Sequence, residues 1–480
     1  MRRKQVMAAA LAVMMAAGSL LTGCGGSGST DSGSAAQQSG QEQAGAEQAG
    51  NAQAGDTQAG DTQAKNASGQ GNGEQTTVTF WAAAVTEERQ GFFDWFADYV
   101  TEVYPDIKVD MLGVPGDLSD YRQKLDVAIQ AGTAPDITND FRPELVLNGY
   151  YENLNPYFES WEDKDNINEA LITSNKTYDP AGEGLYALPY SSQTWNMWVR
   201  PDWLKDAGMD VPVNWNDFFT AVEKMTDTSK DRYGLCIRGG AGSANTLEML
   251  MYAYSGIDRY FTEDGKSTIN DPKNVEFVQK YLVDCYNVYT AQDDLTKGWA
   301  DLANSFQSGK AGIVVHNLGS AASMVQAFEE DYHKFQAAKF PACDGGYVVH
   351  AGLMPLGLSM NSQSKDKDAV WKVISLYLSK EVNTKYCQLY GEIPANMEAA
   401  QDPFFKDSPY MSVGVDIETS ENVKFNDTPY YLPTYSNIQS DMESNIQAVM
   451  SKEMTPQELL DLWAAALEEA YVDYNESVKQ

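Results

Sequence analysis

Residues 76–138 read TTVTFWAAAVTEERQGFFDWFADYVTEVYPDIKVDMLGVPGDLSDYRQKLDVAIQAGTAPDIT, and the apolar residues in this stretch alternate between two spacings. Three short segments have the composition and spacing of β-strands: Thr77–Trp81, Ile107–Met111 and Pro135–Thr138. Between them, apolar residues recur every three or four positions, as on the buried face of a helix. The order strand, helix, strand, helix, strand predicts right-handed crossovers and a mostly parallel sheet. The stretch therefore places the chain in the α/β class.

The two helical patterns in this stretch have clear ends. The apolar positions of the first are Phe92, Phe96, Tyr99 and Val103, and those of the second are Leu118, Tyr121, Leu125 and Ile129. Pro105 stops the first helix and Gly132 stops the second. Further along, 214–225 is predicted to be a helix, and Thr455–Glu458 matches the capping box that begins the last helix.

The overall composition excludes several classes of function. The chain has 34 basic and 68 acidic residues, a net charge of −34, whereas a nucleic-acid-binding protein needs basic patches that displace counterions from phosphates. With three histidines, a zinc enzyme or a histidine-ligated metal site is not expected, and no cofactor is predicted. At 480 residues the chain is long enough that we expect more than one domain.

Five cysteines in a chain of this length do not form a disulfide scaffold. One of them, Cys24, lies close to the N-terminus. The other four are Cys236, Cys285, Cys343 and Cys387, which would allow three pairings. We favour buried free thiols over disulfides, because Cys236 falls in an apolar strand segment and Cys285 in a helical one.

The beginning of the chain has the layout of a bacterial export signal. Three basic residues at positions 2–4 precede an apolar run over 6–21 that is short for a membrane span. Leu21–Cys24 resembles the lipobox of bacterial lipoproteins, in which the peptide is cut before the cysteine and the thiol receives a diacylglyceryl group. The resemblance implies that residues 1–23 are a lipoprotein signal peptide and that Cys24 is the lipidation site. The alternative is an ordinary signal peptide with an incidental cysteine.

Residues 24–77 are predicted to be the lipidated cysteine followed by a disordered tether. Residues 25–77 contain no Val, Ile, Leu, Met, Pro, Cys or aromatic residue before position 78, and A-G-x-x-Q occurs four times in tandem from Ala44 to Gln63. Such a segment has nothing to bury that would offset its ordering entropy, and a Gly-rich coil of this length spans on the order of 40 Å. We therefore expect a mature chain of net charge −37, without the leader's three basic residues, whose body lies at the extracellular face of a membrane. A tether of this length is typical of a Gram-positive cell.

Six phrases of the remaining sequence resemble the bacterial extracellular solute-binding proteins, the capture subunits of ABC importers. They are Ala131–Ile137 (AGTAPDI), Gly149–Leu154 (GYYENL), Gly184–Tyr190 (GLYALPY), Arg200–Phe218 (RPDWL and NWNDF), Phe306–Gly312 (FQSGKAG) and Lys365–Val382. Their order, in register from about residue 76 to 474 and behind the lipobox, is what makes the resemblance specific. The subfamily resembled is the one for carbohydrates, often oligosaccharides.

The resemblance implies an α/β, two-lobe periplasmic-binding-protein-like fold with an interlobe ligand cleft and hinge crossovers. The implied segments are 78–189 and 351–397 for the N-lobe and 190–350 and 398–480 for the C-lobe, with crossings near 189–192, 348–353 and 397. Closure of the lobes would trap the ligand. The implied partners are a carbohydrate, the ABC permease subunits and, through Cys24, the lipid bilayer, and the protein is expected to be a monomer.

Aromatic residues favour a carbohydrate as the solute. The chain has 27 Tyr and 10 Trp, and sugar rings stack on aromatic faces while their hydroxyls pair with carboxylates, amides and guanidinium groups. The candidate ligand-binding residues are Trp81, Asp140, Arg142, Tyr190, Gln193, Trp195, Asn317, Gly319 and Glu392. The alternative for the aromatic members is core packing, and for Asp140 and Arg142 it is a solvated loop or a mutual ion pair. Many relatives place a stacking Trp in the loop that is His316–Gly319 here, and that loop has none.

Two other functions compete with carbohydrate capture. The same scaffold could bind a non-sugar solute such as a polyamine, an anion or a peptide, and a cationic solute would need facing carboxylates in the cleft. A secreted lipoprotein glycoside hydrolase is the remote alternative, since such enzymes need only two carboxylates. The sequence contains no G-x-S-x-G or H-E-x-x-H motif, so we predict a binding protein with no catalytic residues.

Overall fold

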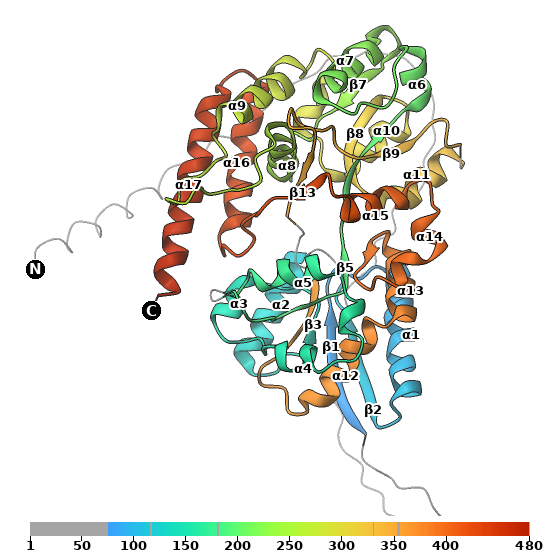
Figure 1. The fold of residues 1–480 in the computed structure, drawn as a ribbon, viewed down its shortest axis with the longest axis vertical. Helices are drawn as coiled ribbons and strands as arrows, with labels where there is room; N and C mark the ends of the chain where they lie inside the picture. Colours follow the sequence, from blue (N-terminus) through green and yellow to red (C-terminus); the bar gives the residue numbers. More distant parts are fainter. Residues whose placement is uncertain (1–74, 116–117, 180–181, 330, 353–355, 480) are drawn as a thin grey trace, which may run out of the picture. The chain divides into compact units, whose positions relative to one another are not determined.

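The computed structural model describes most of the chain after the predicted tether (Figure 1). The described ranges are 75–115, 118–179, 182–329, 331–352 and 356–479. The predicted signal peptide, the Cys24 lipidation site and nearly all of the predicted tether lie outside them. Strand β1 begins at Thr76, so the last two residues of the stretch assigned to the tether belong to a sheet. Within the described ranges, no helix is long and apolar enough to cross a membrane.

The first sheet has five strands in the order β2-β1-β3-β11-β4. Strands β1 (Thr76–Ala82), β2 (Ile107–Gly113) and β3 (Ile137–Thr138) are parallel, and they confirm the three predicted strands. Strand β11 (Gly357–Met360) joins antiparallel to β3, and β4 (Leu188–Pro189) pairs antiparallel with β11. The sheet is therefore mixed, because a segment from much later in the chain supplies one of its strands.

Helices cover this sheet as the apolar spacing predicts. The predicted helical pattern after β1 forms α1, and the one after β2 forms α2, with Phe92, Phe96 and Tyr121 buried. The helices of this part are α1 (Glu87–Val103), α2 (Leu118–Ala131), α3 (Pro143–Leu147), α4 (Asn155–Glu159), α5 (Glu169–Lys176), α12 (Lys367–Tyr377) and α13 (Lys380–Tyr390). The core is rich in aromatic contacts, such as Phe80 against Phe93 with ring centroids 6.1 Å apart.

The second sheet has four strands in the order β7-β8-β6-β9. Strands β7 (Tyr233–Cys236) and β8 (Ala311–Asn317) are parallel, whereas β6 (Trp195–Val199) is antiparallel to both β8 and β9 (Gln336–Ala338). The strands β1, β2 and β3 of residues 76–138 are parallel, as predicted, whereas both sheets of the described structure also contain antiparallel pairs.

The second sheet has its own helices and its own core. They are α6 (Pro201–Asp206), α7 (Trp215–Met225), α8 (Ser243–Ser255), α9 (Pro272–Val278), α10 (Trp299–Gln307), α11 (Ala321–Phe328), α16 (Tyr435–Met450) and α17 (Pro456–Ser477). Helix α7 begins where predicted, with Asn214 as its N-cap, and the capping box of Thr455 and Glu458 is present at the start of α17. Trp463 of α17 is fully buried in this core.

Short strand pairs form where the chain passes from one sheet to the other. Strand β5 (Ser191–Ser192) lies between β4 and β6 in sequence and pairs antiparallel with β12 (Ile393–Pro394). Strand β10 (Val348–His350) pairs with β13 (Val423–Phe425) before the chain enters β11. After β12, the chain continues through α14 (Pro403–Lys406) and α15 (Met411–Thr419), and α15 contacts β6 and β13. The chain therefore joins the two sheets by three connections, and the residue boundaries of the lobes stay a prediction.

The cysteines of the described residues are free thiols, as we favoured. Cys236, Cys285, Cys343 and Cys387 are all buried and none is in a disulfide. Burial raises the pKa of Cys236 and Cys387 well above the usual thiol value, so neither is a reactive thiolate near neutral pH.

Candidate ligand-binding site

A cavity of about 580 Å³ lies at the carboxyl ends of β1 and β3. The loops that follow these strands, Ala83–Ala84 and Asn139–Arg142, line one side of it. Residues from the helices of the second sheet line the other side: Asn245 of α8, and Tyr435 and Gln439 of α16. Ligands of open α/β sheets bind beyond the carboxyl ends of the strands, so the position is that of a ligand site.

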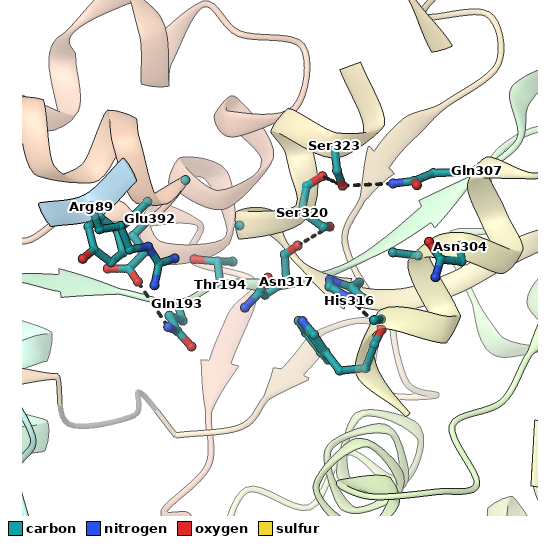
Figure 2. A pocket seen from close by; sticks show the side chains of 16 residues that line it. Arg89, Gln193, Thr194, Asn304, Gln307, His316, Asn317, Ser320, Ser323 and Glu392 are labelled. Carbon is teal, nitrogen blue, oxygen red and sulfur yellow. Dashed lines mark hydrogen bonds between the residues drawn. The ribbon is translucent and has the colours of Figure 1, made fainter. Parts of the chain in front are cut away.

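A second cavity, of about 370 Å³, adjoins the first (Figure 2). Four residues line both cavities: Arg89, Gln193, Tyr390 and Glu392. In Figure 2, Arg89, Glu392 and Gln193 gather at one side of the view, while His316, Asn304 and Gln307 lie toward the other. We call the two cavities together the cleft.

Asp140 and Arg142 line the cleft, but each is held by a different partner. The Arg122 guanidinium donates from Nε and Nη2 to the two carboxylate oxygens of Asp140, both at 2.8 Å. Arg142 donates from Nη2 to Asp126 at 2.5 Å, and its Nε lies 3.4 Å from Glu144. The predicted alternatives, a solvated loop or a mutual ion pair, are therefore both wrong. These pairs fix the loop that follows β3.

Gln193 and Glu392 meet between the two cavities. Gln193 donates from Nε2 to Glu392 Oε1 at 3.1 Å, and Ser191 Oγ donates to Glu392 Oε2 at 2.5 Å. Glu392 is buried, and this burial raises the pKa of its carboxyl group. Because Ser191 belongs to β5 and Glu392 precedes β12, these bonds reinforce the strand pair between the two sheets.

A second carboxylate, that of the half-buried Glu418 of α15, holds the same connection from the other side. Thr194 Oγ1 donates to Glu418 Oε1 at 3.0 Å, and Ser192 Oγ donates to the same oxygen. Burial raises the pKa of Glu418 to about 7. This role was not predicted from the sequence, because nothing near position 418 indicates that α15 packs against the segment of Ser192 and Thr194.

Tyr190 lines the first cavity from within an aromatic cluster. Its ring packs against Tyr377 and Tyr386, with centroids 5.6 and 5.1 Å away. Burial raises the pKa of its hydroxyl well above the usual phenol value, so the ring stays uncharged. Only a small part of Tyr190 is exposed to the cleft.

Trp195 does not line either cavity of the cleft, but it packs against a tryptophan that lines the second one. Its ring makes an edge contact with Trp299, with centroids 5.2 Å apart. Trp299, the first residue of α10, lines the second cavity, and its ring centroid lies 3.4 Å from that of His316. Burial lowers the pKa of His316 to about 4, so this ring is neutral. The loop His316–Gly319 has no tryptophan of its own, but Trp299 of the neighbouring helix α10 lies against it. The sequence did not predict this contact, because all of α10 separates Trp299 from that loop in the chain.

Asn317 and Gly319 both line the second cavity. Asn317 is paired with Trp195 across the β6–β8 ladder, and its carbonyl oxygen accepts a hydrogen bond from Ser320 Oγ at 2.8 Å. Gly319 packs against Gly391, whose φ is +67° and where an added Cβ would lie 3.0 Å from Gly319 Cα. Only glycine fits this crossing of two loops without strain.

Trp81 does not line either cavity. Its side chain is half-buried beside α2, where Lys124 Nζ lies 5.1 Å from the ring centroid. Its carbonyl oxygen accepts a hydrogen bond from Tyr121 at 3.3 Å. Successive side chains of a strand point to opposite faces, and Trp81 lies on the face that α2 covers. The structure thus favours packing over the predicted ligand contact.

Several cleft residues were not predicted from the sequence, because they come from segments that lie far apart in the chain. Tyr435 and Gln439 of α16 both donate to Glu248 Oε2, at 2.8 and 2.7 Å, and burial raises the pKa of Glu248 to about 7. The other missed residues of this kind are Arg89, Tyr178, Asn245, Tyr386, Tyr390 and Tyr430. A cluster of Tyr near the C-terminus was the available signal. Across the part of the chain that the structure describes, no group of His, Cys, Asp and Glu could hold a metal ion.

Known proteins share this architecture. The family model described as bacterial extracellular solute-binding protein matches residues 74–384. A protein of Brucella abortus that is named as a binding protein is 25% identical over 311 residues, which are 63% of this chain and 72% of the relative. Lipoprotein LipO of Bacillus subtilis is 23% identical over 252 residues, which are 48% of each chain.

Among solved structures, the sugar-binding protein MalE of Xanthomonas citri has the same fold. The TM-score is 0.70 at 18% sequence identity, and the match covers 84% of this chain and all of that one. At this identity the likeness shows the two-lobe fold and no more. The matching family and these relatives are binding proteins and not enzymes, in agreement with the prediction. Since the family model spans well over half of the sequence, the chain belongs to the bacterial extracellular solute-binding protein family.

Proposed function

We propose that this protein captures a carbohydrate, an oligosaccharide rather than a single sugar unit, in the cleft and delivers it to an ABC permease. The observation that carries the proposal is the lining of the cleft, which combines aromatic rings with uncharged amides. The half-buried rings are Trp299, Tyr390 and Tyr430, and the buried rings behind them are Phe141, Tyr178, Tyr190, Tyr386 and Tyr435. The amides are Asn139, Gln193, Asn245, Asn304, Gln307, Asn317, Asn437 and Gln439. Rings stack on the apolar faces of sugars, and amides pair with their hydroxyls.

The dimensions of the cleft support the same proposal. Its two cavities, of about 580 and 370 Å³, each fall within the range of small-molecule sites. Since Gln193 and Glu392 line both, a ligand of more than one sugar unit could contact both cavities at once. Among the residues predicted from the sequence, we assign Tyr190, Gln193, Asn317 and Glu392 to direct ligand contact and Asp140 with Arg142 to the wall beside it.

The charges of the cleft oppose a cationic solute. A polyamine needs carboxylates that are free to pair with it, but Asp140 and Glu144 already face Arg122 and Arg142. Glu392 is buried and accepts hydrogen bonds from Ser191 and Gln193. The remaining non-sugar classes, an anion and a peptide, are separated from carbohydrate by experiment.

The test is a thermal-shift screen of the body with neutral and acidic oligosaccharides, polyamines and short peptides. A ligand that binds only the native state raises the melting temperature, so we expect oligosaccharides to raise it and the other classes to leave it unchanged. Isothermal titration of the hits should give micromolar or tighter affinity, with the sugar recovered intact. A shift with polyamines or peptides alone would contradict the proposal.

We also propose that Cys24 carries the lipid anchor and that the tether holds the body at the extracellular face of the membrane, in a Gram-positive cell. This rests on the lipobox-like Leu21–Cys24 and on the composition of residues 25–77. The similarity to a protein named as a lipoprotein supports it. Two acyl chains anchor stably where one does not. Cys24→Ser in cells fed a clickable fatty acid should lose the label and release the protein to the medium, while Cys343→Ser should change neither.

A further inference from the structure

Arg89 is the cation at the centre of the cleft. It lies in the first turn of α1 and lines both cavities. Its guanidinium carbon sits 3.9 Å from the centroid of the Tyr390 ring. Among the side chains that the structure describes, which do not include those of residues 87 and 88, no carboxylate oxygen lies within ion-pair distance of its side-chain nitrogens. Arg89 therefore differs from an arginine whose charge is already compensated.

The other arginines of the cleft wall are compensated. Arg122 makes a two-point contact with Asp140, and Arg142 pairs with Asp126 and Glu144. Their N–H groups are directed at protein carboxylates, so these two residues shape the wall. Of the arginines that line the cleft, Arg89 is the one for which the described structure supplies no such acceptor.

Glu392 lines the same two cavities as Arg89 but does not pair with it. Its oxygens accept from Ser191 and Gln193 instead. Burial dominates the pKa of Glu392 and raises it, while the charge of Arg89 opposes this only weakly. Glu392 is therefore not the ion-pair partner of Arg89.

A second arginine, which does not line either cavity itself, lies against a ring that lines the second one. The guanidinium carbon of Arg238 lies 5.3 Å from the centroid of the Trp299 ring, and its Nε donates to the Ala241 carbonyl at 2.7 Å. No carboxylate of the described chain is within ion-pair distance of Arg238 either. Two arginines, each against an aromatic ring of the cleft, are unexpected in a chain with twice as many acidic as basic residues.

We infer that Arg89 binds an acidic group of the ligand, so that the captured carbohydrate is anionic. The Tyr390 ring covers one face of the guanidinium, and the N–H groups, which lie in its plane, stay available for the two oxygens of a carboxylate, sulfate or phosphate. Closure of the lobes removes water from the site, and an unpaired guanidinium would then be unfavourable. A neutral sugar does not supply the compensating charge. This inference rests on the proposed carbohydrate function and adds the ligand's charge to it.

The test compares matched ligands by isothermal titration against the complete mature body. Trigalacturonate and its trimethyl ester share one glycan backbone, and esterification replaces the three carboxylate charges with uncharged methyl esters. Neocarrabiose 4-sulfate and trehalose 6-phosphate provide the sulfate and phosphate arms. Maltotriose and xylotriose are the neutral sugars. We expect one acidic class to bind roughly tenfold to a hundredfold tighter than the uncharged ligands, as a charge-assisted contact implies.

The variants separate charge from structure. Arg89→Gln keeps hydrogen-bonding capacity and should remove most of the preference for the acidic ligand, while Arg89→Lys should retain part of it because lysine lacks the planar fork. Arg259→Gln removes a charge from an exposed arginine outside the cleft and should leave the preference intact. Melting curves without ligand check that each variant is folded.

Three outcomes would overturn the inference. They are equal affinity of the native protein for trigalacturonate and its methyl ester, tight binding of neutral sugars alone, and equal weakening of acidic and uncharged ligands by Arg89→Gln. In the second case the carbohydrate proposal survives and only the ligand's charge is wrong. If no glycan binds while a peptide or polyamine does, the proposed function itself fails, and this inference fails with it.

Discussion

The charged side chains of the loop after β3 and those of the hinge have different kinds of partner. In the loop after β3, Asp140 and Arg142 are each paired with a group of opposite charge. At the hinge, Glu392 and Glu418 are held by serine, threonine and glutamine side chains, and Arg89 is held by an aromatic ring. The ion pairs fix the wall, whereas burial raises the pKa of Glu418, which is bonded to neutral donors, to about 7. The wall is thus held by opposite charges, and the hinge contains a carboxylate that titrates near neutral pH.

The largest effect is expected from breaking the paired wall. Asp140→Ala leaves the Arg122 guanidinium without its carboxylate and should lower the free energy of unfolding by about 2 kcal/mol. This is below the full loss for a buried pair because the Arg122 side chain is 38% exposed. Urea unfolding measures it. Asp344→Ala, which breaks an exposed pair with Lys273, is the control and should lower stability by less than about 0.5 kcal/mol. Equal effects would show that the wall is not fixed by its charges.

The hinge carboxylates should make stability depend on pH. The pKa of Glu418 is raised to about 7 in the folded protein, above its value in the unfolded chain, so its contribution is present at low pH and lost as the pH rises through about 7. We expect Glu418 alone to lower the free energy of unfolding by on the order of 2 kcal/mol from pH 5 to pH 8. Glu418→Gln should remove this share of the pH dependence in urea titrations.

Glu248 provides a comparison for this experiment. Its pKa is also raised to about 7 by burial, but it lies under α16 and not at the hinge. Glu248→Gln should therefore remove a share of the pH dependence of stability of its own, which adds to the share that Glu418→Gln removes. If Glu418→Gln leaves the slope of stability against pH unchanged, the carboxylate is not protonated in the native state near neutral pH.

A smaller effect is expected at the ring that lines the second cavity. Trp299→Ala should weaken ligand binding about tenfold, because one stacking surface of that cavity is lost. Trp81→Ala removes a tryptophan that packs beside α2, outside the cleft, and should leave affinity unchanged. Titration of both variants with the identified ligand compares them directly. A larger loss with Trp81→Ala would return that residue to the binding site.

The smallest effect concerns the ring beneath Arg89. Tyr390→Phe keeps an aromatic face for the guanidinium and should change affinity less than twofold, whereas Tyr390→Leu removes it and should weaken binding roughly threefold to fivefold. Titration with the same ligand as above measures the difference. Identical affinities for the two variants would show that the ring does not hold Arg89 in place.

Much of the fold follows from local patterns. The strands before and after α1 and α2, the capping box at Thr455 and the α/β class are visible in the spacing of apolar residues and in turn chemistry. Strand β11 is different, because the sequence around Gly357 does not say that it will enter the sheet that begins at Thr76. Such pairings are set by packing between distant segments.

The sequence by itself determined the α/β class and the resemblance to a family of binding proteins, and it predicts a leader and a polar tether before the folded body. These properties depend on composition and short-range spacing, which each segment carries alone. Only the tertiary structure decided that Trp299 reaches the cleft beside the loop without a tryptophan, that Asp140 pairs with Arg122, and that Arg89 rests on Tyr390. The reason is physical: burial, pairing and ring contacts depend on which segments meet, and segments such as those of Arg89 and Tyr390 lie far apart in the chain.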